Sequence, residues 1–453
     1  PLSELVPGKR IQELKTKRIF NSVYFDVNLI EGLKYKFLLG QDLQVYDLGI
    51  FEGQFTNTRK NGSPFGSLRQ AEQSGYTLEN LLTYNKSFGE HALGLTFLQS
   101  AAHQEFHDSF MGAQNLPYET AKWNNLGLGT LTSNFTNFQE YQLLSYMGRV
   151  NYAFKGKYLF QASIRWDGSS RLAEGNKWNS FPGVSVGWRI KDEGFLSGVN
   201  WLTELKLRAS YGKVGNTAVA PYQTQGTLAN TFYDWNNVDA KGFRLDLIPS
   251  EDLSWEVSES IDAGIDFAFF NGRLNGYIDY YQTSTGTSLL LQRQLPPTTG
   301  YSFIWQNIGG TETKGFELTL NAIILDRPNS LKWESEFNFG SLDEKIVDLA
   351  LKGPNGEKVD DIGNGWFIGH PVRVFYDLKK IGIWQADEVE EADGFKQFPG
   401  EIKIEDLNGD GQITLNEDRK VLGNDVPKAY GGFKNKISFK GLDLEVFLYY
   451  RLG

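Results

Sequence analysis

The sequence predicts an all-β protein, a transmembrane antiparallel β-barrel or a portion of one. Apolar and polar residues alternate in many segments, which is typical of strands whose two faces meet different surroundings. The 453 residues include 32 Phe, 21 Tyr, 11 Trp and 49 Gly, yet no apolar run approaches the roughly 20 residues of a membrane helix. The connections between alternating segments are of two kinds, short and long. Short turns at one end and long loops at the other are typical of outer-membrane barrels.

The alternation is clearest in residues 157–167, where one face carries Tyr158, Phe160, Ala162, Ile164 and Trp166. The same pattern recurs in segments 204–211, 262–269, 316–322 and 442–450. In a barrel the apolar face meets lipid and the polar face lines the lumen, whereas in a soluble sandwich the apolar face packs on a second sheet. The aromatic residues at both ends of the 157–167 face favour the barrel, because they would lie near the two membrane interfaces.

The connections predict how many strands there are. Short turns are expected at Glu31-Gly32, Lys86–Gly89, Lys155-Gly156, Ser197-Gly198, Asn271-Gly272, 326–329 and Lys440-Gly441. Long loops are expected at about 47–75, 103–141, 169–180, 213–259, 285–312 and 343–430. Alternation of these turns and loops predicts about fourteen strands, with the long loops extracellular.

Composition and motifs exclude several classes of protein. The formal charge of −10, without a basic stripe, argues against nucleic-acid binding. The absence of cysteine excludes disulfides and thiolate metal sites. The sequence has no nucleophile elbow, phosphate loop or zinc-protease motif, so we predict no enzyme activity. His103 and His107 are four residues apart, a spacing that could bind metal on a helix, but we interpret them as exposed loop histidines.

Residues 406–417, DLNGDGQITLNE, have the spacing of a calcium-binding loop. Oxygen ligands are expected at positions one, three, five, seven, nine and twelve of such a loop, with glycine (here Gly411) at position six. The predicted ligands are Asp406, Asn408, Asp410, Gln412 through its carbonyl, Thr414 and Glu417. An all-oxygen set suits Ca²⁺ before Mg²⁺. The alternatives are a turn without an ion and a loop in which Asp418 replaces or supplements Glu417.

The preceding segment, FPGEIKIE, has no helical pattern. A true EF-hand needs a helix on each side of its loop. Any bound calcium would therefore have a structural role in an extracellular loop, not a sensing role.

Several stretches together resemble the SusC-like (SusC/RagA) TonB-dependent transporters of the Bacteroidetes outer membrane. They include YMGRVNYAFKGKYLFQASIRWDGSSRL (146–172), LKLRASYGKVGN (205–216), NIGGTETKGFELTLNA (307–322) and DLNGDGQI (406–413). They occur in the order found in that family, and the resemblance covers most of the chain from about residue 140. The first 140 residues are compatible with it but less distinctive.

The resemblance implies a fold, a function and partners. It implies a barrel of about 22 strands with an N-terminal plug, in the cell outer membrane and in contact with its lipid. It further implies TonB-dependent import of oligosaccharides or oligopeptides with a SusD-like surface lipoprotein as a lid. Nothing in residues 1–453 resembles the plug or the TonB-binding segment, so we expect an internal portion of the barrel. Other strands would have to complete the wall, because unpaired strand edges are costly in lipid.

Two other functions remain open from the residues. A passive porin-like channel would show the same alternation and the same loop asymmetry. A soluble calcium-binding lectin or adhesin sandwich would place the apolar faces between two sheets.

Overall fold

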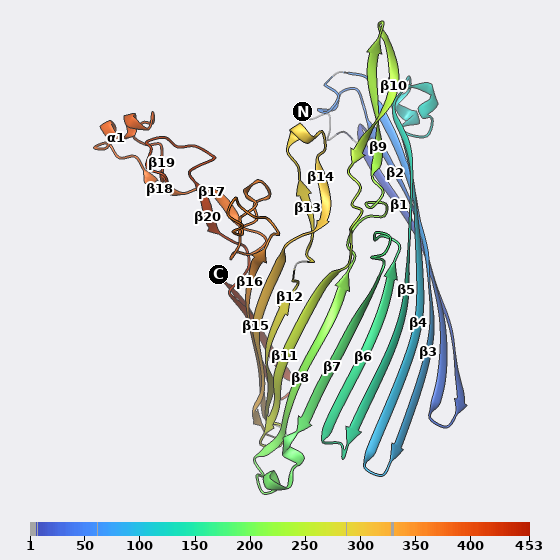
Figure 1. Ribbon diagram of the computed structural model, residues 1–453, viewed down its shortest axis with the longest axis vertical. Helices are drawn as coiled ribbons and strands as arrows, with labels where there is room; N and C mark the ends of the chain where they lie inside the picture. Colours follow the sequence, from blue (N-terminus) through green and yellow to red (C-terminus); the bar gives the residue numbers. More distant parts are fainter. Residues whose placement is uncertain (1–5, 7, 61, 287, 328–329) are drawn as a thin grey trace. The chain divides into compact units, whose positions relative to one another are not determined.

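Fourteen antiparallel strands form the main sheet of the computed structural model, which describes residues 6, 8–60, 62–286, 288–327 and 330–453 (Figure 1). The strand order is β1-β2-β3-β4-β5-β6-β7-β8-β11-β12-β15-β16-β21-β22, so strands that follow each other in the chain are neighbours except where smaller hairpins are inserted. The predicted all-β class and the predicted number of strands are confirmed.

The strands of the main sheet have the following bounds. The first seven are β1 (Arg10–Ile30), β2 (Leu33–Glu52), β3 (Phe65–Phe88), β4 (His91–Gln114), β5 (Thr130–Phe154), β6 (Tyr158–Ser169) and β7 (Trp178–Arg189). The other seven are β8 (Leu202–Asn216), β11 (Glu256–Phe269), β12 (Leu274–Ser284), β15 (Gly310–Asp326), β16 (Leu331–Asp348), β21 (Ala429–Phe439) and β22 (Leu442–Leu452).

Four two-stranded sheets lie in the loops. They pair β9 (Thr227–Trp235) with β10 (Val238–Leu247), β13 (Leu290–Gln294) with β14 (Phe303–Asn307), β17 (Phe375–Leu378) with β20 (Arg419–Gly423), and β18 (Lys380–Ile383) with β19 (Ile402–Ile404). The α-helix α1 (Val389–Gly394) has six residues. Within the described ranges, no helix is long and apolar enough to cross a membrane.

The chain divides into two compact units. Unit 1 comprises residues 1–154, 161–182 and 217–254. Its strands β2 to β5 have 20 to 25 residues, longer than the sequence predicted. The predicted loops 47–75 and 103–141 are wrong in their bounds, because β2 continues to Glu52, β3 starts at Phe65, β4 continues to Gln114 and β5 starts at Thr130. Those strand ends are rich in polar residues on both faces, which hides the alternation, but backbone pairing does not require it.

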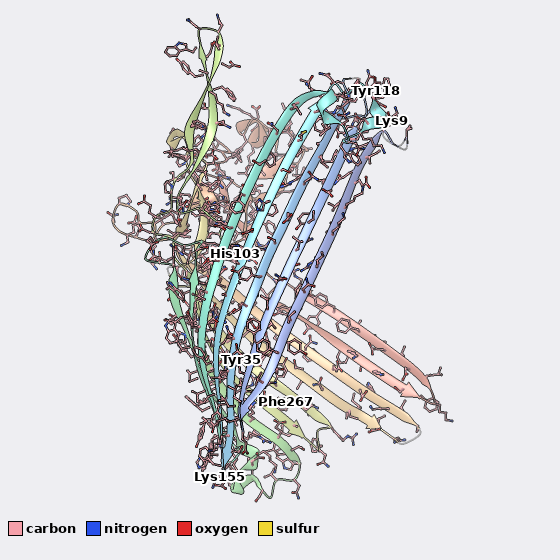
Figure 2. All side chains as sticks on the ribbon, turned by 90° about the vertical axis from the view of Figure 1, so that its right-hand side faces the viewer. Lys9, Tyr35, His103, Tyr118, Lys155 and Phe267 are labelled. Atoms are coloured by element: carbon pink, nitrogen blue, oxygen red, sulfur yellow. The ribbon has the colours of Figure 1, made fainter. Side chains whose placement is uncertain are left out.

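A small apolar core closes one end of unit 1. Phe51 and Ala113 are fully buried there, and Leu116 and Leu126 are only 5% exposed. The last two belong to the segment that joins β4 to β5 and contains the 3₁₀ turns Glu119–Ala121 and Leu126–Leu128. Lys9 and Tyr118 lie at this end of the long strands (Figure 2).

Unit 2 comprises residues 155–160, 183–216 and 255–453. The turn after β11 is the predicted one, with Asn271 and Gly272 both at positive φ. The turn predicted at Ser197-Gly198 is instead a longer connection that contains two 3₁₀ turns, Ile190–Asp192 and Gly194–Leu196. The turn predicted at 326–329 includes residues 328–329, which lie outside the described residues.

The connection between β16 and β21 folds into a small structure with a core of its own. Trp384 is 2% exposed there, and its Nε1 donates a hydrogen bond of 2.6 Å to Gln397 Oε1. Lys403 Nζ lies 4.0 Å from the centroid of the Trp384 ring. Strands β17 to β20, helix α1 and the predicted calcium loop all belong to this connection.

Candidate functional site

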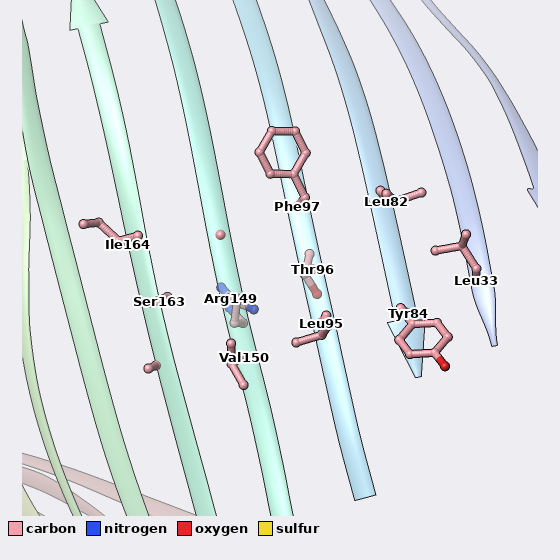
Figure 3. Close-up of a pocket in the computed structure, with 12 residues that line it drawn as sticks. Leu33, Leu82, Tyr84, Leu95, Thr96, Phe97, Arg149, Val150, Ser163 and Ile164 are labelled. Atoms are coloured by element: carbon pink, nitrogen blue, oxygen red, sulfur yellow. The ribbon is translucent and has the colours of Figure 1, made fainter. Parts of the chain in front are cut away.

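One face of the main sheet is apolar and exposed. In unit 1 it carries Leu82, Leu95, Phe97, Val150 and Ile164, which line a shallow groove together with Leu33 and Tyr84 (Figure 3). Phe97 at the centre of this surface is 52% exposed. Exposed apolar side chains on consecutive strands are unusual on a soluble monomer and are the feature that faces lipid in a membrane barrel.

The same apolar face is present in unit 2. It carries Val186, Leu207, Ile265, Ile278 and Tyr280, which are brought side by side by the register of β7, β8, β11 and β12. Val186 is 51% exposed. The apolar faces predicted for segments 204–211 and 262–269 are thus confirmed as part of one surface of unit 2, and Ala162 and Ile164 of segment 157–167 belong to the groove of unit 1.

The opposite face is charged, and its charges are paired. In unit 2, Arg208 binds Asp266 (2.9 Å) and Asp279 (2.7 Å), and Lys206 Nζ lies 3.2 Å from Asp266. Gly264 makes room for this network, since a Cβ there would lie 2.1 Å from Asp279 Oδ1 and 2.6 Å from Arg208 Cζ. Pairing offsets the desolvation cost of holding these charges on a half-buried wall.

Unit 1 has similar pairs on its polar face. Arg165 binds Asp167 at 2.8 Å and Ser145 at 2.9 Å. Arg69 makes two bonds to Asp108, of 2.9 and 2.7 Å. One face of each unit therefore suits hydrocarbon and the other suits an aqueous lumen.

Hydrogen bonds from backbone N–H groups to side chains of the same loop hold the 406–417 loop in its conformation. Asp406 accepts hydrogen bonds from Gly409 N (2.8 Å) and Gly411 N (2.9 Å). Asn408 Oδ1 accepts from Asp410 N at 3.1 Å, and Asp410 Oδ1 accepts from Gln412 N at 2.8 Å. Gly411 has φ +77°, as the sharp turn at position six requires. The side chains at the first, third and fifth predicted ligand positions thus each accept a backbone N–H group of the same turn.

Glu417 lies beside two other residues of the predicted set, Asn408 and Thr414. Glu417 Oε2 lies 3.4 Å from both Asn408 Nδ2 and Thr414 Oγ1. The structure therefore places Asn408, Thr414 and Glu417 of the predicted set next to one another, and oxygen atoms of the predicted kind fit a hard cation. Strand β19 precedes the loop, which agrees with the absence of an entering helix.

Asp418, the alternative closing residue, is held by backbone groups of the loop. It is fully buried, and its carboxylate accepts hydrogen bonds from Leu407 N (3.0 Å) and Thr414 N (2.6 Å). These N–H groups hold the pKa of Asp418 below its usual value. Through these two bonds Asp418 fastens the start of the loop, at Leu407, to its later part, at Thr414.

Sequence reasoning missed a second group of side chains that could hold a metal. His103 and His107 do not lie in a loop, as predicted, but within β4. His103 lies close to Glu105 and to Glu140 of β5. The group depends on the pairing register of two strands, for which the sequence carries no local signal.

Comparisons with known proteins agree with the two-faced sheet. The family model described as "TonB dependent receptor-like, beta-barrel" matches residues 12–366. The chain belongs to the TonB-dependent receptor family. It is 34% identical over 393 residues to TonB-dependent receptor P26 of Formosa agariphila, covering 84% of this chain and 39% of the relative. It is 30% identical over 328 residues to TonB-dependent receptor SusC of Bacteroides thetaiotaomicron, covering 68% of this chain and 31% of SusC.

Solved structures show the same fold. The RagAB peptide transporter superposes with a TM-score of 0.84 at 22% identity, covering 98% of this chain and 48% of the other. The predicted resemblance to SusC-like receptors is confirmed, as is the transmembrane barrel fold. This receptor chain spans less than half the length of the curated relatives it matches.

Proposed function

We propose that this TonB-dependent receptor chain forms part of the wall of an outer-membrane importer for oligosaccharides or oligopeptides. The observation that carries the proposal is the pair of opposite faces, since an exposed apolar face requires lipid and a paired, charged face suits a water-filled lumen. In this proposal the chain is an internal portion of a barrel of about 22 strands. The plug and the TonB-binding segment would then come from other parts of the protein.

We propose the partners of this chain from those of the SusC-like importers that it resembles. SusC-like importers work with a SusD-like surface lipoprotein, and TonB supplies the energy for transport through a plugged barrel. Two relatives support this proposal, because one is SusC and the other, of similar structure, is the RagAB peptide transporter. The family consists of receptors and transporters, and we assign no catalytic step to any residue.

Uptake in cells tests the import function against a passive channel. The full-length receptor would be expressed in its native host, and uptake of labelled oligosaccharides and oligopeptides would be measured with and without TonB. Loss of uptake in the TonB-deficient strain is expected. Uptake that persists without TonB would show a porin-like channel instead, and a receptor found in the soluble fraction would show a lectin-like protein. The proposed SusD-like partner is tested by purifying the receptor from native membranes, where a surface lipoprotein should co-purify with it.

We further propose that the 406–417 loop binds Ca²⁺ as a structural ion, with Mg²⁺ as the weaker alternative. Two observations support it: Glu417 contacts Asn408 and Thr414, and Asp406 and Asp410 accept backbone N–H groups within the same turn. Isothermal titration of the full-length receptor with Ca²⁺ tests it. We expect the D410N variant to lose this binding, whereas D387N, an exposed acid in the same connection, would keep it. Equal binding by the two variants would refute the site.

A further inference from the structure

A cluster of three side chains on the apolar side of unit 1 has a composition that suits a transition metal. His103 and Glu105 are in β4, and Glu140 is in β5. One nitrogen of the imidazole and one oxygen of each carboxylate lie within 4.8 Å of one another. Figure 2 shows His103 part-way along β4.

The two carboxylates are in a position that electrostatics disfavours. Glu105 and Glu140 are directly opposite each other in the antiparallel register. Like charges in that arrangement repel each other across the strands. The neighbouring positions on this face that the described pairing identifies are occupied by Ser74, His103, His107, Phe138 and Gln142. None of these is a lysine or an arginine, so the repulsion has no basic side chain to offset it at those positions.

The histidine is held in place with one nitrogen unused. Its ring stacks on Tyr76, with centroids 5.4 Å apart, and its Nε2 lies 2.8 Å from Glu105 Oε1. Its Nδ1 is buried and has no hydrogen-bond partner within the described chain. An imidazole fixed between an aromatic ring and a carboxylate is already oriented, so little side-chain freedom would be lost when a ligand binds.

We propose that His103, Glu105 and Glu140 bind a divalent transition-metal ion such as Zn²⁺, with water completing the coordination. One imidazole nitrogen and two carboxylate oxygens form a ligand set that first-row divalent ions accept, and the all-oxygen preference of Ca²⁺ does not match it. The ion would also cancel the repulsion between Glu105 and Glu140. Three protein ligands leave coordination positions open, as in many zinc sites that exchange ligands.

The site lies beyond the lipid-facing part of the strands. A strand crosses a membrane with about 9 to 11 residues, and β4 starts at His91. By this count His103 and Glu105, at positions 13 and 15 of β4, both lie past the apolar belt. There the ion would tie β4 to β5 where both strands continue outside hydrocarbon. Tyr222 contacts the backbone at Glu140, where its hydroxyl accepts a hydrogen bond of 3.1 Å from Glu140 N.

Zinc titration of the purified full-length receptor tests this site. The titration is done by calorimetry with Ca²⁺ in excess, so that the 406–417 loop does not take up Zn²⁺. We expect one equivalent of Zn²⁺ to bind to the wild-type receptor. The H103Q and E140Q variants should each bind about tenfold or more weakly, because each loses a ligand. H107Q is the matched control, since His107 is on the same strand and face but outside the cluster, and it should bind like the wild type.

Substitution with Co²⁺ gives a second readout that does not depend on heat. Visible absorption bands typical of bound cobalt should appear in the wild type and in H107Q and be lost in H103Q. Heat-modifiable migration on gels shows whether each variant is folded, and E105Q replaces any variant that fails this check. A wild type without zinc binding, or a folded H103Q that binds like the wild type, would overturn the proposal. Neither result bears on import, which the TonB experiment tests separately.

Discussion

Two surface segments of this receptor are held in opposite ways. The segment between β4 and β5, residues 115–129, buries Leu116 and Leu126 against Phe51 and Ala113. The segment between β19 and β20, residues 405–418, leaves two of its three large apolar side chains exposed, Leu407 by 40% and Leu415 by 60%, while Ile413 is half-buried. Its order comes from carboxylates that accept backbone N–H groups, above all the buried Asp418.

The difference shows which solution conditions each segment should respond to. Apolar burial does not depend on metal ions or on moderate changes of pH. Carboxylates that accept N–H groups depend on their charge, and a calcium loop depends on its ion. We therefore expect residues 115–129 to lose their folded structure when a core side chain is truncated. We expect residues 405–418 to lose theirs when their carboxylates are neutralised or a bound ion is removed.

The largest effect is expected from L126A. The leucine is almost completely buried, and truncation of such a side chain costs about 2–5 kcal/mol. Hydrogen exchange of residues 115–129 should accelerate strongly, while residues 405–418 keep their protection. L128A is the matched control, because Leu128 lies in the same segment and is 51% exposed. Equal acceleration in both variants would show that the core does not hold the segment.

Removal of calcium should have the next largest effect, and only in unit 2. A ligand present at about 100 times its dissociation constant stabilises the bound form by about 2.7 kcal/mol. Treatment with EGTA should therefore expose residues 405–418 to limited proteolysis and leave residues 115–129 resistant. When Ca²⁺ is added back, residues 405–418 should again resist proteolysis, whereas K⁺ should not restore this resistance. Unchanged cleavage in EGTA would mean that the N–H bonds alone hold the loop.

Acid should open 405–418 through Asp418. Because the pKa of its carboxyl is lowered in the folded protein, its contribution to stability is present above the ordinary aspartate pKa of about 3.9. That contribution is lost as the pH falls through the lowered value. Hydrogen exchange in calcium-free buffer should show that the residual protection of the loop persists at about pH 5 and is lost only below about pH 4. The D418N variant should lack this transition, and a D418N loop with the same pH profile would contradict the assignment.

The smallest effect is expected from E119Q. Glu119 accepts a bond of 2.6 Å from Lys9 Nζ and one of 3.0 Å from Gln54 N, and the former is the main cause of its lowered pKa. Both side chains of the ion pair are about one-third exposed, and pairs of this kind contribute about 0.2–1 kcal/mol. Protection of residues 115–129 should fall slightly in 20 mM salt and not at all in 500 mM salt. A loss as large as that of L126A would mean that the pair, not the apolar core, holds the segment.

Much of the fold could be predicted because alternation and turn residues are local signals. The apolar faces of β6, β8 and β11 and the turn at Asn271-Gly272 follow from neighbouring residues alone. The ends of β4 and β5 could not be predicted in this way. Segments such as 99–109, QSAAHQEFHDS, carry polar residues on both faces, and they are strands because a partner strand satisfies their backbone groups.

The 406–417 loop and the cluster of His103, Glu105 and Glu140 also differ in whether neighbouring residues alone could predict them. The side chains of the 406–417 loop lie within twelve consecutive residues, so their spacing alone could predict a shared site, and Asn408 and Glu417 are in contact in the structure. Glu140 is 35 positions away from Glu105, and only the register of β4 and β5 places them opposite each other. The role of Asp418 depends on burial, which no motif states.

The length of β4 and β5 has a consequence for how a cell would display this receptor. At about 3.4 Å per residue, strands of 24 and 25 residues are much longer than a bilayer requires. More than half of each would stand above the lipid as paired backbone. Antibodies, phages and proteases that approach from outside would first contact these paired strands. Proteases would then cut the connections, whose backbone is not paired with a neighbouring strand.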